Sequence, residues 1–194
     1  RLQRVYMRRI LEPVVDAALG QFPVVVITGA RQTGKSTLVQ NLASSAARSY
    51  ATLDEMATLE RAQRSPDSLL EQAAEITLDE VQRAPRILLA IKRAVDKQRR
   101  KGRFLLTASA NLLLMRRVSE SLAGRAIYLT LLPMSVREKR GVPDAEPWRL
   151  IVNAKSIQEI TTALTGYLNA KEDWTASALI GGYPSVVLAE SQDE

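Results

Sequence analysis

The sequence predicts an α/β fold in which helices cover a parallel sheet. Short apolar runs rich in β-branched residues alternate with longer segments of helical periodicity, which is the pattern of βαβ units. The first of these runs, Val24-Val25-Val26-Ile27, is continuously apolar, as a buried parallel strand should be. It leads into a glycine-containing loop, which a helix-compatible stretch from Leu38 to Ala47 follows.

Residues 1–20 are expected to form an N-terminal helix, because apolar residues recur at helical spacing between Leu2 and Ala18. Pro13 falls inside this segment and is expected to kink or split the helix. Gly20 ends it, and the chain then enters the first strand. The segment is either a packing helix or an arm beside the ligand site or a neighbouring subunit.

The loop after the first strand fits the phosphate-binding pattern G-x-x-x-x-G-K-[ST]. Its glycines let successive backbone N–H groups curl around phosphate oxygens, and the following helix points its positive end at the same place. Lys35 is expected to reach the β- and γ-phosphates of a nucleotide, and the Ser36 hydroxyl to bind Mg²⁺. The predicted nucleotide-binding residues are Gly29, Ala30, Arg31, Gln32, Thr33, Gly34, Lys35, Ser36 and Thr37.

The next elements continue the alternation. Residues 49–53 are expected to form a second strand, and residues 56–74 two helical pieces broken near Ser65-Pro66. The short apolar strand that follows ends in two carboxylates, Asp79 and Glu80. Asp79 is expected to hold Mg²⁺ opposite Ser36, and Glu80 to orient or deprotonate an attacking water. The alternative is an acidic strand end on the surface.

After a predicted helix from Pro85 to about Lys101, another buried strand covers residues 104–107. Ser109 and Asn111 follow it and are candidates to touch the γ-phosphate or the attacking water, unless they serve ordinary turn chemistry. Arg125 precedes the strand predicted over residues 126–131. It is a candidate arginine finger or γ-phosphate sensor, with a surface salt bridge as the alternative.

Residues 134–194 read as a mainly helical segment. Ser135-Val136-Arg137-Glu138 matches a capping box, so a helix is expected to begin there. Residues 156–169 and 172–180 have moderate helical character, and Gly181-Gly182-Tyr183-Pro184 forms a sharp turn. We therefore divide the chain into an N-terminal helix (1–20), a nucleotide-binding core (21–133) and a helical C-terminal segment (134–194).

Composition limits the chemistry. The 194 residues include no cysteine and no histidine, which excludes thiolate catalysis, Ser-His-Asp triads and His-ligated metals. Phosphoryl transfer remains, because it depends mainly on positioning and on charge stabilisation. The net charge of +6 permits nucleic-acid contacts, for which the basic segments 99–103 and 137–140 are candidates. No apolar run approaches the roughly 20 residues of a membrane span, so we expect no membrane contact. The absence of cysteine agrees with the reducing cytosol, and we expect a cytoplasmic protein.

Five segments, GARQTGKSTL, ITLDEVQRAP, RFLLTASAN, SLAGRAIYLTLLPMS and GGYP, together resemble a family of bacterial and archaeal ATPases. In that family an AAA-type ATPase domain precedes a C-terminal domain of unknown function, so the resemblance implies that residues 134–194 are the start of a truncated C-terminal domain. The resemblance implies a P-loop NTPase fold: three α/β/α layers around a five-stranded parallel sheet, with one strand inserted between the phosphate-loop and Asp-Glu strands. It also implies ATP as the nucleotide. Ala108 stands where the family usually has Gly, which predicts strain if that turn needs a positive φ.

These observations predict an Mg²⁺-dependent ATPase that acts as a nucleotide-driven switch. Lys35, Glu80 and Arg125 are its expected catalytic residues, with ATP and Mg²⁺ as cofactors bound through Ser36 and Asp79. Arg125 acts either in its own subunit or across a homo-oligomer interface. Two alternatives are an ATPase that acts on nucleic acid and a nucleotide-gated interaction module with little turnover.

Overall fold

The computed structural model describes residues 6–109, 122–142, 147–168 and 174–190. The chain divides into two compact units, Arg1–Leu132 and Pro133–Glu194. The first unit contains a five-stranded sheet in the order β2-β3-β4-β1-β5, and every pair of neighbouring strands is parallel. The expected five-stranded parallel sheet is thus confirmed, including the strand β4 inserted between β1 and β3. The strands are β1 (Val24–Gly29), β2 (Ser49–Thr52), β3 (Ile76–Asp79), β4 (Phe104–Ser109) and β5 (Ala126–Thr130).

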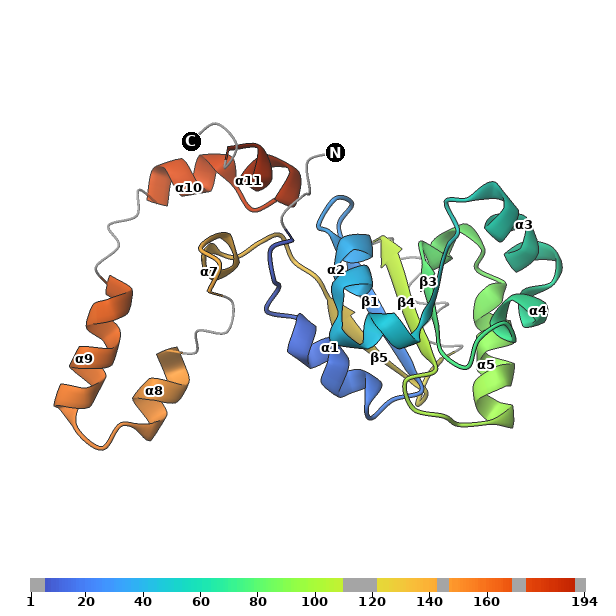
Figure 1. Ribbon diagram of the computed structural model, residues 1–194, viewed down its shortest axis with the longest axis horizontal. Coiled ribbons are helices and arrows are strands. Elements are labelled where there is room, and N and C mark those ends of the chain that lie inside the picture. The colour runs from blue at the N-terminus through green and yellow to red at the C-terminus, as the bar shows by residue number, and fades with distance from the viewer. Residues whose placement is uncertain (1–5, 110–121, 143–146, 169–173, 191–194) are drawn as a thin grey trace. The chain divides into compact units, whose positions relative to one another are not determined.

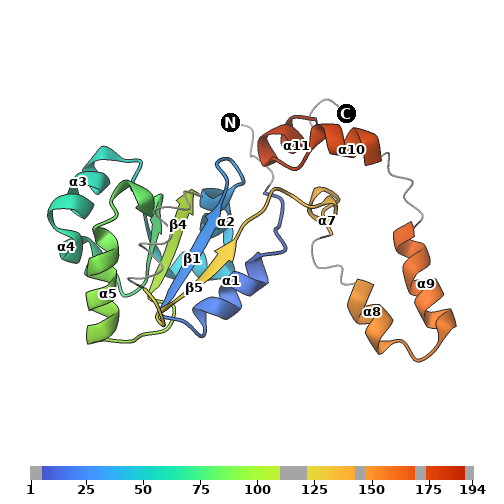
Figure 2. The same cartoon turned by 180° about the vertical axis from the view of Figure 1, so that it is seen from behind.

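Helices cover both faces of this sheet, as Figure 1 and the reverse view in Figure 2 show. Alternate residues of β1 point to opposite faces, so Val25 and Ile27 pack with α1 and α2, whereas Val24 and Val26 pack with α3, α4 and α5. The result is the predicted three-layer α/β/α arrangement. The covering helices are α1 (Glu12–Leu19), α2 (Lys35–Asn41), α3 (Met56–Arg64), α4 (Pro66–Leu70) and α5 (Ile87–Lys97).

Two local expectations need correction. The N-terminal helix begins only at Glu12, and Pro13 lies in its first turn, where a missing N–H costs nothing, so Pro13 starts the helix and does not kink it. Ala108 lies within the extended strand β4. Among the described residues only Gln32 and Glu80 are non-glycine residues with positive φ, so the strain expected at Ala108 is absent.

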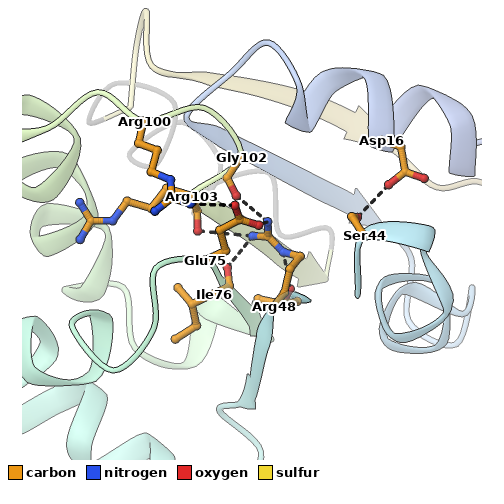
Figure 3. A network of polar contacts seen from close by, with 9 residues as sticks. Asp16, Ser44, Arg48, Glu75, Ile76, Arg100, Gly102 and Arg103 are labelled. Atoms are coloured by element: carbon orange, nitrogen blue, oxygen red, sulfur yellow. Dashed lines mark hydrogen bonds and ion pairs between the residues drawn. The ribbon is translucent and has the colours of Figure 1, made fainter. Parts of the chain in front are cut away.

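At the edge of the sheet where the strands begin, a buried arginine joins three of them (Figure 3). The Arg48 guanidinium, just before β2, donates to the carbonyl oxygens of Ile76 (2.9 Å), Gly102 (2.5 Å) and Arg103 (3.4 Å). It also pairs with the Glu75 carboxylate at 3.3 Å. Burial lowers the pKa of Arg48, yet these acceptors compensate the buried charge. Arg48 therefore aligns the strand starts, while the strand ends carry the candidate site.

The second unit is helical in its described part. Its helices are α7 (Val136–Lys139), α8 (Pro147–Asn153), α9 (Ile157–Leu168), α10 (Trp174–Ile180) and α11 (Pro184–Glu190). The predicted capping box is present, since the Ser135 hydroxyl accepts from the Glu138 N–H and the Glu138 carboxylate from the Ser135 N–H. The backbone of Gly182 packs against the backbone of Met134, and a Cβ on residue 182 would clash with the Met134 carbonyl oxygen. None of the helices described in either unit is both long and apolar enough to cross a bilayer.

Candidate active site

The phosphate loop connects β1 to α2 through a backbone that needs glycine. Gly29 has φ 154°, and a Cβ on it would clash with the carbonyl oxygen of Leu131. Gly34 has φ 91° and Gln32 has φ 64°, so the chain turns through the left-handed region twice within the loop. Turns of this kind present several backbone N–H groups to one anion. The local geometry therefore supports phosphate binding.

Lys35 lies at the first position of α2 with only 4% of its surface exposed. Its ammonium group donates to the carbonyl oxygens of Gly29 at 3.1 Å and Ala30 at 2.7 Å. Burial lowers the pKa of Lys35, although the nearby carboxylates of Glu80 and Asp79 act in the opposite direction. A buried ammonium next to the loop is placed to meet a phosphate dianion.

The carboxylate of Asp79, at the end of β3, accepts hydrogen bonds from three hydroxyl groups. Its Oδ2 accepts from Ser36 Oγ at 2.8 Å and from the Tyr50 hydroxyl at 3.0 Å, and its Oδ1 accepts from Thr107. Only 3% of Asp79 is exposed. The sequence-predicted pair, Ser36 and Asp79, is therefore in direct contact. An alcohol oxygen beside a carboxylate oxygen fits Mg²⁺, which takes oxygen ligands and needs few from the protein when a nucleotide supplies others.

Glu80 follows Asp79 in a left-handed conformation with φ 59°. Its backbone N–H donates to Thr107 Oγ1 at 3.0 Å, so one hydroxyl holds both members of the Asp-Glu pair. Its carboxylate accepts from the side-chain amide of Gln82. Gln82 also donates to the Ser109 hydroxyl at 2.8 Å, which joins Glu80 to the end of β4. Non-glycine residues with such backbone values cluster at functional sites.

Sequence reasoning missed Gln82 and Tyr50. Gln82 lies in a short 3-10 helix from Val81 to Arg83, and its two-residue spacing from Glu80 was the signal available in the sequence. Tyr50 lies on the edge strand β2, beside β3, and its approach to Asp79 follows only from the strand order. Tyr50 and Gln82 complete the polar surroundings of the two carboxylates.

The other predicted residues fall into three groups. Ala30, Arg31, Gln32 and Thr37 are exposed on or beside the loop, whereas Thr33 is fully buried. Ser109 reaches the site through Gln82. Asn111 lies outside the described residues.

Arg125 is not brought to the phosphate loop of its own chain. It precedes β5, whose first residue pairs with Val24 at the start of β1, whereas the loop follows the end of β1. Five residue steps separate these ends, or about 16 Å at the rise of a β-strand. The Arg125 guanidinium instead donates to Asp96 at 2.5 Å and lowers the pKa of that carboxyl group. The structure thus excludes Arg125 from its own chain's site, and a role towards a neighbouring subunit stays a prediction.

The basic segment 99–103 precedes β4 and therefore lies at the side of the sheet where the strands begin, away from the phosphate loop. We call this side the distal edge, and the segment makes local contacts there. Arg99 donates to the Gly124 carbonyl at 2.9 Å, and Arg100 pairs with Glu75 at 3.1 Å. The Arg103 guanidinium lies 5.0 Å from the centroid of the Phe104 ring. These contacts favour a structural role for the segment, away from the phosphate loop.

The chain is similar in sequence to a protein family and to two uncharacterized proteins, and similar in fold to a solved structure. A family model described as an AAA domain matches residues 21–139. Two uncharacterized proteins, from Mycobacterium bovis and Mycobacterium tuberculosis, are each 35% identical over 121 residues, which is 62% of this chain and 27% of theirs. The chain thus matches about a quarter of the length of these relatives. A solved Walker-type ATPase of Pyrococcus abyssi has the same fold, with a TM-score of 0.54 at 13% identity over 97% of this chain and 67% of that one.

Proposed function

The chain belongs to the AAA domain family, and from this premise we propose that it binds ATP with Mg²⁺ at the phosphate loop and hydrolyses it as a nucleotide-driven switch. The observation that carries the proposal is the 2.8 Å contact between Ser36 Oγ and Asp79 Oδ2, beside the buried ammonium of Lys35. Loop, lysine, hydroxyl and carboxylate together are the parts that a P-loop NTPase needs.

Each residue has a distinct role in this proposal. The loop N–H groups and Lys35 bind the β- and γ-phosphates, and Ser36 and Asp79 hold Mg²⁺. When bound, Mg²⁺ neutralises charge that develops on the phosphate oxygens. Glu80 orients the attacking water and accepts its proton. Ser109, at the end of β4, senses the γ-phosphate through its link to Gln82.

Calorimetric titration with ATP tests the binding half of the proposal. Wild-type protein should bind ATP more tightly with Mg²⁺ than with EDTA. Lys35→Ala should lose most of this affinity, because it removes the cation that meets the phosphates. Lys101→Ala, at the exposed distal edge, is the matched control and should bind as the wild type does. An affinity for ATP that is unchanged by EDTA and by Lys35→Ala would refute the proposal.

A nucleotide-gated interaction module with little turnover is the second candidate. The hydrogen bond from Gln82 to the Glu80 carboxylate favours it, because a carboxylate engaged in this way is less available to a water molecule. Under this candidate, Gln82→Ala should raise the rate of phosphate release at saturating ATP. If Gln82 instead positions Glu80 for catalysis, the same variant should lower that rate.

Further parts of the function stay predictions. Homo-oligomerisation follows from a role of Arg125 in a neighbouring subunit and is tested by sedimentation with and without ATP. A nucleic-acid-acting ATPase requires salt-dependent binding to DNA or RNA and turnover that nucleic acid stimulates. Cytoplasmic localisation is part of the same proposal.

A further inference from the structure

A second buried arginine lies behind the phosphate loop, in the segment that precedes α1. Arg9 is 4% exposed. Its two terminal nitrogens reach different parts of the chain: NH1 donates to the carbonyl oxygen of Thr33 at 2.8 Å, and NH2 donates to the carbonyl oxygen of Leu132 at 2.8 Å. Thr33 belongs to the phosphate loop, and Leu132 lies just beyond β5. Arg9 therefore joins the loop to the end of the neighbouring strand.

Because the peptide between Thr33 and Gly34 is trans, its C=O and N–H bonds point in opposite directions. A hydrogen bond that holds the Thr33 oxygen towards Arg9 consequently holds the Gly34 N–H away from it. Backbone N–H groups of such loops are the donors that bind phosphate. The orientation of one of these donors thus depends on a side chain 24 residues upstream of Thr33.

The segment that carries Arg9 is itself held by Glu12, the first residue of α1. The Glu12 Oε1 accepts from the Arg9 N–H at 2.5 Å and from the Tyr6 hydroxyl at 2.6 Å. Helix α1 in turn packs on the sheet through Val15 and Leu19. This arrangement fixes the backbone of Arg9, so its guanidinium enters the protein from a defined position.

We propose that Arg9 is a positioning residue for nucleotide binding, which acts by orienting the Thr33–Gly34 peptide of the phosphate loop. The proposal rests on the proposed function of that loop. It explains why a charge is buried here, since desolvation of a guanidinium is unfavourable unless well-placed acceptors compensate it. It also requires arginine, because a lysine ammonium is a single point donor and cannot serve both carbonyls with the geometry of the guanidinium fork.

Titration of the full chain with Mg·ADP tests the proposal. Arg9→Ala should weaken binding about 10- to 100-fold, the range expected when one or two hydrogen bonds from a charged donor are lost. The affinity of Arg9→Lys for Mg·ADP should lie between the affinities of Arg9→Ala and the wild type. Arg8→Ala is the matched control in the same segment: its side chain is 55% exposed, and it should bind Mg·ADP within about twofold of the wild type.

Chemical rescue separates positioning from general loss of structure. Millimolar guanidinium should restore part of the affinity of Arg9→Ala and leave the affinities of wild type and Arg8→Ala unchanged. Affinity of Arg9→Ala equal to wild type, or a loss that guanidinium does not reverse while Arg9→Lys binds as wild type, would overturn the proposal.

A measurement without nucleotide keeps this result distinct from the proposed function. The backbone amide resonance of Gly34 should shift in Arg9→Ala, and in Arg9→Lys if the alanine variant does not fold, but not in Arg8→Ala. An unshifted resonance contradicts the positioning role. If wild-type protein binds no nucleotide, the proposed function fails, and the Gly34 resonance alone decides whether Arg9 orients the loop.

Discussion

Thr107 is the residue at which stability and the candidate site are most closely linked, and its replacement by valine tests both. The side chain of Thr107 is fully buried on β4. Its hydroxyl donates to the Asp79 carboxylate and accepts from the Glu80 N–H at 3.0 Å. Valine keeps the shape and replaces the hydroxyl with a methyl group. The change therefore removes two hydrogen bonds with little change in packing.

The size of the effect follows from these contacts. Loss of a hydrogen bond to a charged group costs about 1.5–3 kcal/mol, and the Glu80 N–H left without a partner costs about 1–3 kcal/mol more. Burial of the added methyl group returns about 0.8 kcal/mol. Asp79 keeps its donors Ser36 and Tyr50, which places the first cost at its lower end. We expect a net destabilisation of about 2–4 kcal/mol.

Urea unfolding followed by far-ultraviolet circular dichroism measures this change. Tryptophan fluorescence is unsuitable, because both tryptophans, Trp148 and Trp174, lie in the second unit. Thr107→Ser is the matched control: it keeps the hydroxyl, loses one methyl group and should cost only about 1 kcal/mol. If Thr107→Val unfolds at the same urea concentration as Thr107→Ser, the two hydrogen bonds do not contribute as described and the reasoning is refuted.

Three further predictions concern other parts of the first unit. Gly29→Ala should abolish ATP binding in a calorimetric titration, because its Cβ clashes with the Leu131 carbonyl; unchanged affinity contradicts this. Arg48→Met should lower the free energy of unfolding in urea by about 2–4 kcal/mol, since three carbonyls lose a charged donor; a loss below about 1 kcal/mol counts against it. Burial and the hydrogen bond to Glu12 raise the pKa of Tyr6 above 10.0, so the stability that Tyr6 contributes is complete below pH 10.0 and declines above it. In urea unfolding above pH 10.0, the free energy of unfolding should therefore fall less with pH in Tyr6→Phe than in the wild type; an equal fall in both proteins refutes this.

The sheet and the centre of the site were predictable from the sequence because their signals are local. The run Val24–Ile27 and the spacing from Gly29 to Ser36 lie within a short segment, and Asp79 ends a short apolar strand of its own. Parallel strands bring their carboxyl ends to one side of a sheet, so Ser36, which follows β1, and Asp79, which ends β3, are expected on that same side, and the structure brings them into contact.

The rest depends on contacts that periodicity does not encode. Arg9 reaches Leu132 across 123 positions of sequence, and no pattern in its own segment signals that partner. Gln82 lies in the short 3-10 helix from Val81 to Arg83, and its role becomes visible only when β4 brings Ser109 beside it. The prediction for Arg125 relied on its place next to a strand, but residues before a strand and residues after one lie at opposite ends of the strands in a parallel sheet.

The central claim is that this site hydrolyses ATP through Glu80, and phosphate release at saturating Mg·ATP tests it most directly. Glu80→Gln keeps the size of the side chain and removes its charge. The variant should bind ATP as tightly as the wild type and release phosphate more slowly by a factor of about 100 or more, which is the contribution typical of a general base. Equal rates of phosphate release in the wild type and in Glu80→Gln would contradict the claim.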